Sequence, residues 1–584
     1  MSLLQVDGLT VCYGDDAAVS ELSFAVERGE SVGLVGESGS GKTQTAMAIL
    51  GLLPSTADVA GSISLGGTEL LGASQKSLDA LRACKMAIVF QDPMQALNPF
   101  VRVGAQLSRI LLQHKLADRQ QAHTQVLEMF ERVGLPDVAR QYAAYPHQMS
   151  GGMRQRAMIA AALITEPVLL IADEPTTALD VTVQAQILEL LAEIRRDTAL
   201  LLITHDLGVV AGHCERMLVV EHGSLVEQGS TKDVFASPQH AHTASLLAAA
   251  PRLDRSNILA ATPGDEVLQI EDLSVSYALH GQDALRAVRG VDLFVRASET
   301  VAVVGESGSG KSSLVRAALG LVPMQAGRVS LCGVELRGLV EERPTKARRG
   351  MQLVFQDPAG SLNPQMRVAK IVAEPLQVHE ATLAEGEKQE RVVAMLNKVG
   401  LSPEFLSRYP HQLSGGQAQR VAIARALILG PKVLICDEAV AALDGTAREK
   451  ILKLLRDVQA ETGLSIIFIT HDLSVVRAIS HRVMVMYMGA TVELADNAAL
   501  FGNARHPYTK ALLGAVPVPD PEHAGGKTTL DGEIPSALKP PSGCTFHPRC
   551  PQAEEICRAD PPQQRDVGGT LVACHRAEEL LERR

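Results

Sequence analysis

The most constraining feature of this 584-residue chain is a long internal repeat. The segment GESGSGKT at residues 36–43 returns as GESGSGKS at 305–312, and five further motifs recur in the same order. A repeat of this length predicts two copies of one phosphate-handling domain on one polypeptide. The five motifs recur 264 to 266 residues later, and their paired first residues are Phe90 and Phe355 (FQDP), Tyr145 and Tyr409 (YPHQ), Ser150 and Ser414 (SGG), Asp173 and Asp437 (DE), and Thr204 and Thr470 (THDL).

The overall composition excludes several classes of protein. A chain of this length is too long for one hydrophobic core, so several compact units are expected. The formal net charge of −11 argues against a nucleic-acid-binding surface. No apolar stretch reaches the roughly 18 residues that predict a membrane-spanning helix, and the first residues lack the pattern of a signal peptide. We therefore expect a cytosolic protein whose membrane association depends on partners.

Each repeat has the pattern of an α/β domain. An apolar strand leads into each glycine-rich loop and a helix pattern follows it. Continuous apolar runs such as VLLIAD and VLICD are typical of strands buried on both faces of a parallel sheet. Polar, helix-favouring segments at about residues 100–145 and 365–409 predict an inserted helical subdomain in each copy. The expected division is a first domain at 1–250, a linker at 251–265, a second domain at 266–518 and a cysteine-rich extension at 519–584.

The glycine-rich loops carry the chemistry of phosphate binding. In a GxxxxGK[ST] loop between a strand and a helix, backbone N–H groups surround phosphates, the lysine neutralises the β- and γ-phosphates, and the hydroxyl binds Mg²⁺. Lys42 with Thr43, and Lys311 with Ser312, fill these roles. One match can arise by chance, but two in the same setting predict two ATP sites. The other loop residues expected to hold ATP are Gly36, Ser38, Gly39, Ser40, Gly41, Gly305, Ser307, Gly308, Ser309 and Gly310.

A pair of carboxylates ends a later apolar strand in each copy. Asp173 and Asp437 are expected to hold Mg²⁺ directly or through water. Glu174 and Glu438 follow one residue on, where a carboxylate can polarise the water that attacks the γ-phosphate. The alternative is an ordinary acidic pair at a strand end. The phosphate loop in the same domain favours the catalytic interpretation.

SGGMRQR at residues 150–156 and LSGGQ at 413–417 complete a resemblance to the ATP-binding-cassette (ABC) ATPases, and it covers essentially the whole chain. The resemblance implies two tandem P-loop NTPase domains that close head to tail around two ATP molecules. One composite site would consist of Lys42, Thr43, Asp173, Glu174, Ser414, Gly415, Gly416 and Gln417. The other would consist of Lys311, Ser312, Asp437, Glu438, Ser150, Gly151, Gly152 and Met153.

The resemblance also implies roles for two glutamines and two histidines. Gln91 and Gln356 match the glutamine that contacts Mg²⁺ and the attacking water and senses the transmembrane partner. His205 and His471 match the histidine that contacts the γ-phosphate. A lone histidine after a strand is usually structural, but this one lies within THDL in both copies, which favours the functional interpretation.

Four further residues match family positions outside the catalytic group. Asp180 and Asp444 match the loop that crosses the dimer interface, and Tyr13 and Tyr277 match the aromatic residue that stacks on adenine, although a strand-end tyrosine is common in any case. Neither departure from the family pattern removes a reacting group, so both sites are expected to hydrolyse ATP. The two departures are Met153 in place of glutamine and Ala439 in place of proline.

The wording of the motifs resembles one branch of the family, the bacterial oligopeptide/dipeptide importers. FQDPMQALNP and IADEPTTALDVTVQAQI are similar to one ATPase subunit of that branch, and FQDPAGSLNP and HPYTKALLGAVP to its partner subunit. The chain thus resembles both subunits fused, so that one chain supplies both nucleotide-binding domains. The family implies uptake of peptides or peptide-like solutes with two permease subunits and an extracytoplasmic binding protein. The implied location is the cytoplasmic face of the inner membrane.

Four of the nine cysteines cluster near the C-terminus: Cys544, Cys550, Cys557 and Cys574. In a reducing compartment such a cluster favours a metal site over disulfides, although the spacing is not the close C-x2-C pairing usual for zinc. Some family members carry a [4Fe–4S] cluster here, so the resemblance implies an iron–sulfur site. The alternatives are Zn²⁺, with His547 or His575 as a further ligand, and unmetallated thiols.

A second function class is a soluble twin-cassette ATPase that acts on ribosomes or DNA. Such proteins usually carry a long charged linker between the cassettes, whereas the linker here is short and not rich in charge. A ribosome-recycling type would carry its cysteine cluster at the N-terminus, where this chain has only Cys12. The sequence therefore favours the importer.

Overall fold

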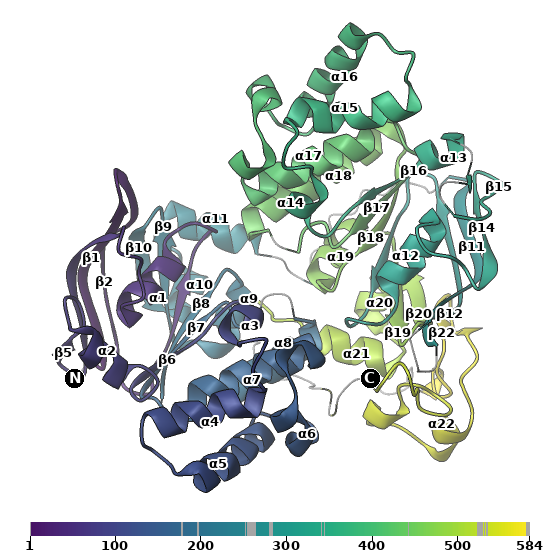
Figure 1. The fold of residues 1–584 in the computed structure, drawn as a ribbon. Helices are drawn as coiled ribbons and strands as arrows, with labels where there is room; N and C mark the ends of the chain where they lie inside the picture. The colour runs from purple at the N-terminus through teal and green to yellow at the C-terminus, as the bar shows by residue number, and fades with distance from the viewer. Residues whose placement is uncertain are drawn as a thin grey trace.

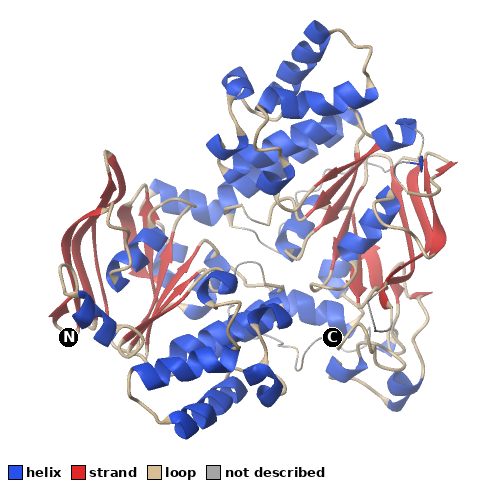
Figure 2. Ribbon diagram, viewed as in Figure 1, coloured by secondary structure: helices blue, strands red, loops and turns tan. Residues whose placement is uncertain are grey.

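The computed structural model describes residues 2–176, 179–194, 198–250, 253, 264–278, 284–339, 342–343, 345–441, 443–522, 530, 532 and 535–579. It contains two cassettes, each with a mainly parallel sheet, a small antiparallel sheet and a group of helices (Figures 1 and 2). The predicted α/β fold with two tandem P-loop domains is confirmed. Most of the linker predicted at 251–265 lies outside the described residues.

The main sheet of the first cassette has the strand order β10-β9-β3-β8-β7-β6. Its strands are β3 Ser31–Val35, β6 Met86–Val89, β7 Leu169–Asp173, β8 Ala199–Thr204, β9 Arg216–Glu221 and β10 Ser224–Ser230. All neighbours are parallel except the pair of β9 with the edge strand β10. Every residue of β3, β7 and β8 is buried, because alternate side chains enter hydrophobic cores on opposite faces of the sheet.

A second, antiparallel sheet with the order β2-β1-β4-β5 shares one of these cores. Its strands are β1 Leu4–Tyr13, β2 Asp16–Val26, β4 Asp58–Leu65 and β5 Thr68–Glu69. The helices beside it are α1 Lys42–Leu50 and α2 Gln75–Leu81. Helix α1 begins at the end of the phosphate loop and stops at Gly51, whose φ of 62° suits a residue without a side chain.

The inserted helical subdomain predicted for the first copy is present. Its helices are α3 Pro93–Ala96, α4 Val103–Gln113, α5 Arg119–Arg132, α6 Val138–Ala143, η1 Pro146–Gln148 and α7 Gly151–Leu163. Helix α5 starts where the Asp118 side chain accepts the Gln121 N–H, and the Gln121 side chain accepts the Asp118 N–H in return. The remaining helices of this cassette are α8 Val181–Ile194, α9 Leu207–His213, α10 Thr231–Ala236 and α11 Ala241–Ala249.

The second cassette repeats this architecture strand for strand. Its antiparallel sheet, β12-β11-β14-β15, consists of β11 Glu266–Tyr277, β12 Leu285–Arg296, β14 Ala326–Leu331 and β15 Val334–Glu335. Its main sheet begins β16-β17-β18-β13-β19-β20, with β13 Thr300–Val304, β16 Met351–Val354, β17 Val433–Asp437, β18 Ser465–Ile469, β19 Arg482–Tyr487 and β20 Ala490–Asp496. The two sheets have the same order of equivalent strands, as expected if both halves derive from one domain type.

The helices of the second cassette follow the same order as those of the first. They are α12 Lys311–Leu319, α13 Thr345–Gly350, α14 Pro358–Ser361, α15 Val368–His379, α16 Glu385–Lys398, η3 Pro403–Ser407, η4 Pro410–Gln412, α17 Gly415–Leu427, α18 Gly445–Thr462, α19 Leu473–Ile479, α20 Asn497–Asn503 and α21 Pro507–Gly514. In the part of the chain that the structure describes, no helix is long and apolar enough to span a bilayer.

The C-terminal extension adds two short strands to the second main sheet. Its elements are η5 His547–Arg549, α22 Glu555–Ala559, β21 Arg565–Asp566 and β22 Leu571–Val572. Strand β22 pairs antiparallel with β20, and β21 pairs with β22 at the new edge. The extension therefore packs beside the second cassette (Figure 1).

A shared hydrophobic core joins the two cassettes and the extension. It contains Val181 and Ala185 of α8 from the first cassette, Tyr487 and Tyr508 from the second, and Phe546 from the extension. The rings of Tyr487 and Tyr508 lie 4.7 Å apart, and Phe546 lies 5.4 Å from each. Helices α8 and α21 meet at this place in Figure 1. Burying large aromatic rings from three segments stabilises this arrangement.

Candidate active sites

In both phosphate loops, the lysine side chain donates hydrogen bonds to carbonyl oxygens of its own loop. The Nζ atom of Lys42 donates to the carbonyl oxygens of Gly36 and Glu37, at 2.9 and 2.7 Å. Lys311 does the same in the second loop, at 2.7 and 2.9 Å. Burial lowers the pKa of both ammonium groups, against the carboxylates around them. Each loop therefore presents one lysine at the start of a helix, the arrangement that binds phosphate.

Glycine is required in these loops because the backbone passes close to other segments. A Cβ atom on Gly36 would collide with the carbonyl oxygen of Val220, and one on Gly305 with that of Met486. Gly41 and Gly310 precede the helices at φ of 92° and 102°, a region that other residues avoid. The glycines predicted to shape the loop thus have a direct steric reason.

The strand-end aspartates lie beside the loop hydroxyls. Ser312 donates to Asp437 at 3.1 Å, and Thr43 contacts Asp173 in the same way. Burial raises the pKa of both aspartates. The buried Oδ1 atom of Asp173 has no hydrogen-bond partner among the described residues. A buried carboxylate oxygen without a hydrogen-bond partner, next to a hydroxyl group, is a suitable ligand for Mg²⁺, which prefers oxygen ligands.

Each predicted catalytic glutamate is held between a glutamine and a histidine. Gln91 donates to one carboxylate oxygen of Glu174 at 2.8 Å, and His205 Nδ1 lies 3.0 Å from the other. The two glutamates share a left-handed backbone, with φ of 46° for Glu174 and 50° for Glu438. Such conformations cost free energy and are concentrated at functional sites.

The second copy repeats this contact set around Glu438. Gln356 donates to one of its oxygens at 2.6 Å, and His471 Nδ1 lies 3.4 Å from the other. Burial acts to raise the pKa of Glu438, but the hydrogen bond and charge of His471 outweigh it, so the pKa is held below its ordinary value. Glu438 is therefore a carboxylate at neutral pH, the form that a general base requires.

The cassettes contact each other through the residue that precedes α8 and through the first turn of α18. Asp180 of the first cassette accepts the backbone N–H of Ser307 in the second phosphate loop, at 2.7 Å. In the opposite direction, Thr446 of the second cassette donates to Glu37 of the first phosphate loop, at 2.7 Å. These reciprocal contacts are those of a head-to-tail arrangement. Asp444 also lies close enough to Lys42 for its charge to oppose the lowering of the lysine pKa by burial.

The two signature helices begin differently. Ser414 accepts the N–H of Gln417 and donates its own N–H to the Gln417 side chain, at 3.4 and 2.9 Å. In the first cassette Ser150 makes the same pair of contacts with Met153, at 3.2 and 3.4 Å, but the second acceptor is a thioether sulfur. Sulfur is a weak acceptor, so the N-terminus of α7 is capped less well. No contact recorded between described residues joins either serine to the opposite phosphate loop.

The predicted adenine-stacking tyrosines lie on the antiparallel sheets next to the phosphate-loop helices. The hydroxyl of Tyr13 donates to Gln44 at 2.7 Å, and that of Tyr277 donates to Ser313 at 3.2 Å. Both rings are partly exposed. Each ring is thereby fixed beside the loop that would hold the phosphates of the same nucleotide.

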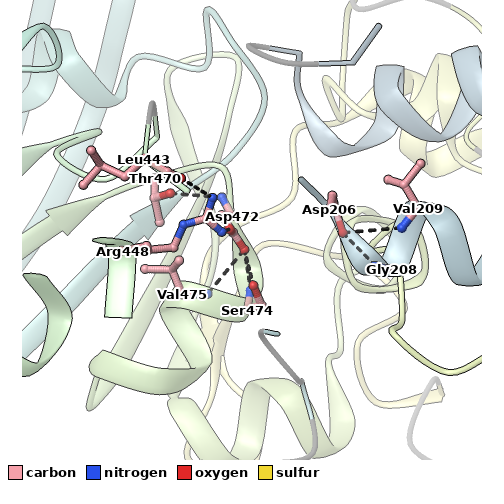
Figure 3. A network of polar contacts seen from close by, with 9 residues as sticks. All are labelled: Asp206, Gly208, Val209, Leu443, Arg448, Thr470, Asp472, Ser474 and Val475. Carbon is pink, nitrogen blue, oxygen red and sulfur yellow. Dashed lines mark hydrogen bonds and ion pairs between the residues drawn. The ribbon is translucent and has the colours of Figure 1, made fainter. Parts of the chain in front are cut away.

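Sequence reasoning missed a pair of aspartates that flank the cavity between the cassettes. Asp206 and Asp472 each begin a helix by accepting two backbone N–H groups (Figure 3). Arg448 donates to Asp472 at 2.9 Å, whereas the matching position in the first cassette is Gln184. Both aspartates, His205 and Arg448 line the cavity. The signal was the THDL aspartate in both copies with an arginine in only one.

This asymmetry predicts that Asp206 lowers the stability of the fold in a pH-dependent way. Burial and the charge of Asp472 raise the pKa of Asp206, although the charges of His205 and Arg448 oppose this rise. Asp472 is also buried, but the charge of Arg448 helps to lower its pKa. Because a raised pKa means that folding favours the protonated carboxyl, the wild type loses stability as the pH rises from about 4 through the raised pKa. Asn keeps the helix cap without the charge.

We therefore expect Asp206→Asn to raise the thermal midpoint at pH 8 by about 1–3 °C, with the gain vanishing near pH 4. Differential scanning calorimetry at both values checks this. Asp472→Asn is the matched control and should lower the midpoint at pH 8, because Arg448 loses its partner. An equal gain at both pH values would contradict the assignment.

The four C-terminal cysteines line one small cavity together with His547 and His575. All four are free thiols. Burial, with the nearby thiols, raises the pKa of Cys544, Cys550 and Cys574. Within the described ranges, however, no group of three or more His, Cys, Asp or Glu side chains is placed to hold a metal ion. The iron–sulfur prediction and its zinc alternative thus gain no support beyond the convergence of the thiols.

Comparison with protein families decides the classification. The family described as "ABC transporter" matches residues 19–177 and 288–441, more than half of the chain. The chain belongs to the ABC transporter family. A second family, "Oligopeptide/dipeptide transporter, C-terminal region", matches residues 226–275 and 492–557. ABC transporter ATP-binding proteins hydrolyse ATP to drive transport, so this chain is an ATP hydrolase of that kind, and the ribosome or DNA alternative has no support.

The match at 226–275 shows that the first cassette also contains a segment of this C-terminal region. Both cassettes end in the same strand and two helices, β10-α10-α11 and β20-α20-α21. In the first, Glu227 accepts the N–H groups of Gln239 and His240. In the second, Glu493 accepts those of Arg505 and His506. The two copies carry related sequences here, HAHTASLL at 240–247 and HPYTKALL at 506–513.

Several relatives match along almost their whole length. The glutathione import ATP-binding protein GsiA of Pectobacterium atrosepticum is 42% identical over 89% of this chain and 90% of the relative. GsiA of Escherichia coli is 40% identical over 92% and 93%. The peptidoglycan transport ATP-binding protein YejF of Agrobacterium fabrum is 44% identical over 88% and 96%. These relatives therefore contain the same two-cassette architecture.

Proposed function

We propose that this chain supplies both ATP-hydrolysing domains of an importer for peptides or peptide-like solutes. The observation that carries the proposal is the glutamate held between glutamine and histidine in both cassettes, beside a phosphate loop that the opposite cassette contacts. ATP would draw the cassettes together, and hydrolysis would release them. The relatives named for glutathione and peptidoglycan transport support a peptide-like cargo.

The position of each site residue suggests its role in ATP hydrolysis. Lys42 and Lys311 would neutralise the β- and γ-phosphates, and Glu174 and Glu438 would accept the proton of the attacking water. When bound, Mg²⁺ would neutralise charge on the phosphates. The matched hydroxyls, aspartates and glutamines of both copies would hold it: Thr43, Asp173, Gln91, Ser312, Asp437 and Gln356.

Co-purification and uptake test this proposal directly. We expect the full chain, expressed with its neighbouring genes, to co-purify with two permease subunits and not with ribosomes. A substrate-binding protein would deliver cargo from outside, and the chain would work at the cytoplasmic face of the inner membrane. Vesicles loaded with ATP should take up labelled glutathione or a dipeptide, and vesicles without ATP should not. Association with ribosomes and ATP-independent uptake would each overturn the proposal.

An exposed apolar segment marks the expected permease contact on the first cassette. Phe100 is 88% exposed, and Met94 and Val101 lie nearby in sequence. The matching residue of the second cassette is Gln365. Because a buried aromatic anchor dominates many interfaces, we expect Phe100→Ala to weaken permease binding about tenfold and leave the ATPase rate of the isolated chain unchanged. Gln365→Ala is the matched control, and an equal loss in both variants would contradict the assignment.

We also propose that the four clustered cysteines hold a [4Fe–4S] cluster, with Zn²⁺ as the alternative. The thiols already surround one cavity, and a bound metal would favour their deprotonated form. The bound metal would cross-link the C-terminal extension, which has little secondary structure of its own. Anaerobically purified protein is expected to contain about four iron atoms per chain and to absorb visible light. Zinc without iron would select the alternative, and neither metal would refute both.

A further inference from the structure

A buried ion pair connects the C-terminal extension to the second phosphate loop. Arg549 precedes Cys550 in the extension, and Glu306 is the second residue of the loop that contains Lys311. The guanidinium of Arg549 donates to both carboxylate oxygens of Glu306, at 2.7 and 3.0 Å. The side chains are 3% and 1% exposed. A charge so deeply buried is costly without its partner, so each residue fixes the position of the other.

The same glutamate and its neighbour are held from two other directions. Thr182 of the first cassette donates to the Glu306 carboxylate. The backbone N–H of Glu306 donates to the hydroxyl of Tyr508 at 2.9 Å, and that of Ser307 donates to Asp180. Three separate parts of the chain therefore converge on the first residues of one phosphate loop. Their combined effect is to fix the peptide groups that would face the phosphates.

Among the described residues, the first phosphate loop has only one of these contacts, since Thr446 matches Thr182 and contacts Glu37 as Thr182 contacts Glu306. Its glutamate, Glu37, is partly exposed and accepts a hydrogen bond from Thr446. No ion pair of Glu37 is recorded within the described ranges of the chain. The residue that matches Tyr508 is His242, which pairs with Glu221 instead. The two loops share a sequence but differ in what holds them.

We propose that Arg549 and Glu306 are positioning residues that make the second phosphate loop, and not the first, depend on the C-terminal extension. The two ATP sites are then unequal: the extension preorganises the loop of Lys311, while the loop of Lys42 orders on binding. A bidentate guanidinium–carboxylate pair suits this purpose because it fixes orientation as well as distance. The proposal rests on the proposed function only in taking residues 305–312 as a phosphate site.

Hydrogen-exchange mass spectrometry of the nucleotide-free full chain tests the loop itself. In Arg549→Met we expect backbone exchange in peptides covering residues 305–312 to accelerate at least about fivefold, while residues 36–43 stay within about 1.5-fold of wild type. Arg558→Met, an exposed arginine of the same extension, is the control and should change neither loop. Arg549→Lys keeps the positive charge but loses the bidentate geometry of the guanidinium, so it should give an intermediate exchange rate at residues 305–312.

ATP affinity provides the second measurement. With the first site disabled by Lys42→Ala, Arg549→Met should weaken ATP binding at the second site about tenfold; with Lys311→Ala instead, it should change binding less than about twofold. If Arg549→Met does not fold, the double variant Glu306→Gln with Arg549→Gln leaves no lone buried charge and should show the same loop-specific acceleration.

Equal acceleration of both loops would overturn the proposal, as would no acceleration in a variant with the wild-type thermal midpoint. Absence of ATP binding in the unmodified chain would instead refute the proposed function. The exchange rates of the two loops would still decide the role of Arg549, because that measurement uses no nucleotide.

Discussion

Replacing Glu174 and Glu438 together with Gln is expected to lower ATP turnover at least about 100-fold, because a positioned general base contributes factors of this size. Gln has nearly the same shape and can still accept from Gln91 and Gln356 through its carbonyl oxygen, so the site should keep its geometry. ATP affinity should stay within about threefold of wild type. Phosphate release and equilibrium ATP binding measure the two quantities separately.

Glu189→Gln is the matched control, since Glu189 is an exposed carboxylate on α8 of the first cassette. It should leave both turnover and affinity unchanged. A double variant that retains more than about one tenth of wild-type turnover would show that neither glutamate acts as the base. Loss of ATP affinity together with turnover would show instead that the glutamates shape the binding site.

Removing one phosphate-loop lysine is expected to abolish binding at one site and spare the other. Lys42→Ala and Lys311→Ala should each reduce bound ATP from two molecules per chain to one, with affinity at the altered site falling at least about 100-fold, and the double variant should bind none. The loss has two causes in the structure. The cation expected to neutralise the phosphates disappears, and the loop loses the hydrogen bonds from the lysine to two of its carbonyl oxygens.

Equilibrium dialysis with labelled ATP gives the stoichiometry of each variant. Lys450→Ala removes an exposed lysine from α18 and serves as the control, with two ATP molecules still bound. Two molecules bound to the double lysine variant would place the nucleotide sites elsewhere. One molecule bound to the wild type would mean that only one of the loops is competent.

Much of the fold was predictable because the repeat and the motifs are local patterns with strict steric and electrostatic requirements. Apolar runs placed β7 and β17 in the sheet interior, and the loop glycines placed the helix starts. The predicted inserted helices are present. The first cassette ends in a matching segment with histidine, threonine and two leucines at the same spacing, but the residues between them differ.

The contacts between distant residues could not be read from patterns. Asp206 and Asp472 differ in their surroundings because the side chains of Arg448 and Ser474 contact only Asp472 among the described residues. The cysteines were visible as a cluster in sequence, but their convergence on one cavity depends on how the extension packs. The sequence shows which residues are present in each copy, but these contacts depend on tertiary packing.

The sequence by itself determined the class of protein, and it predicted two phosphate sites and the groups in each. Those properties follow from short segments whose chemistry is complete within a few residues. Only the tertiary structure decided how the support of the two phosphate loops differs, because Arg549 meets Glu306 across 243 residues of chain. Burying that pair requires the extension, the second cassette and α8 of the first to pack together, and no local sequence encodes such packing.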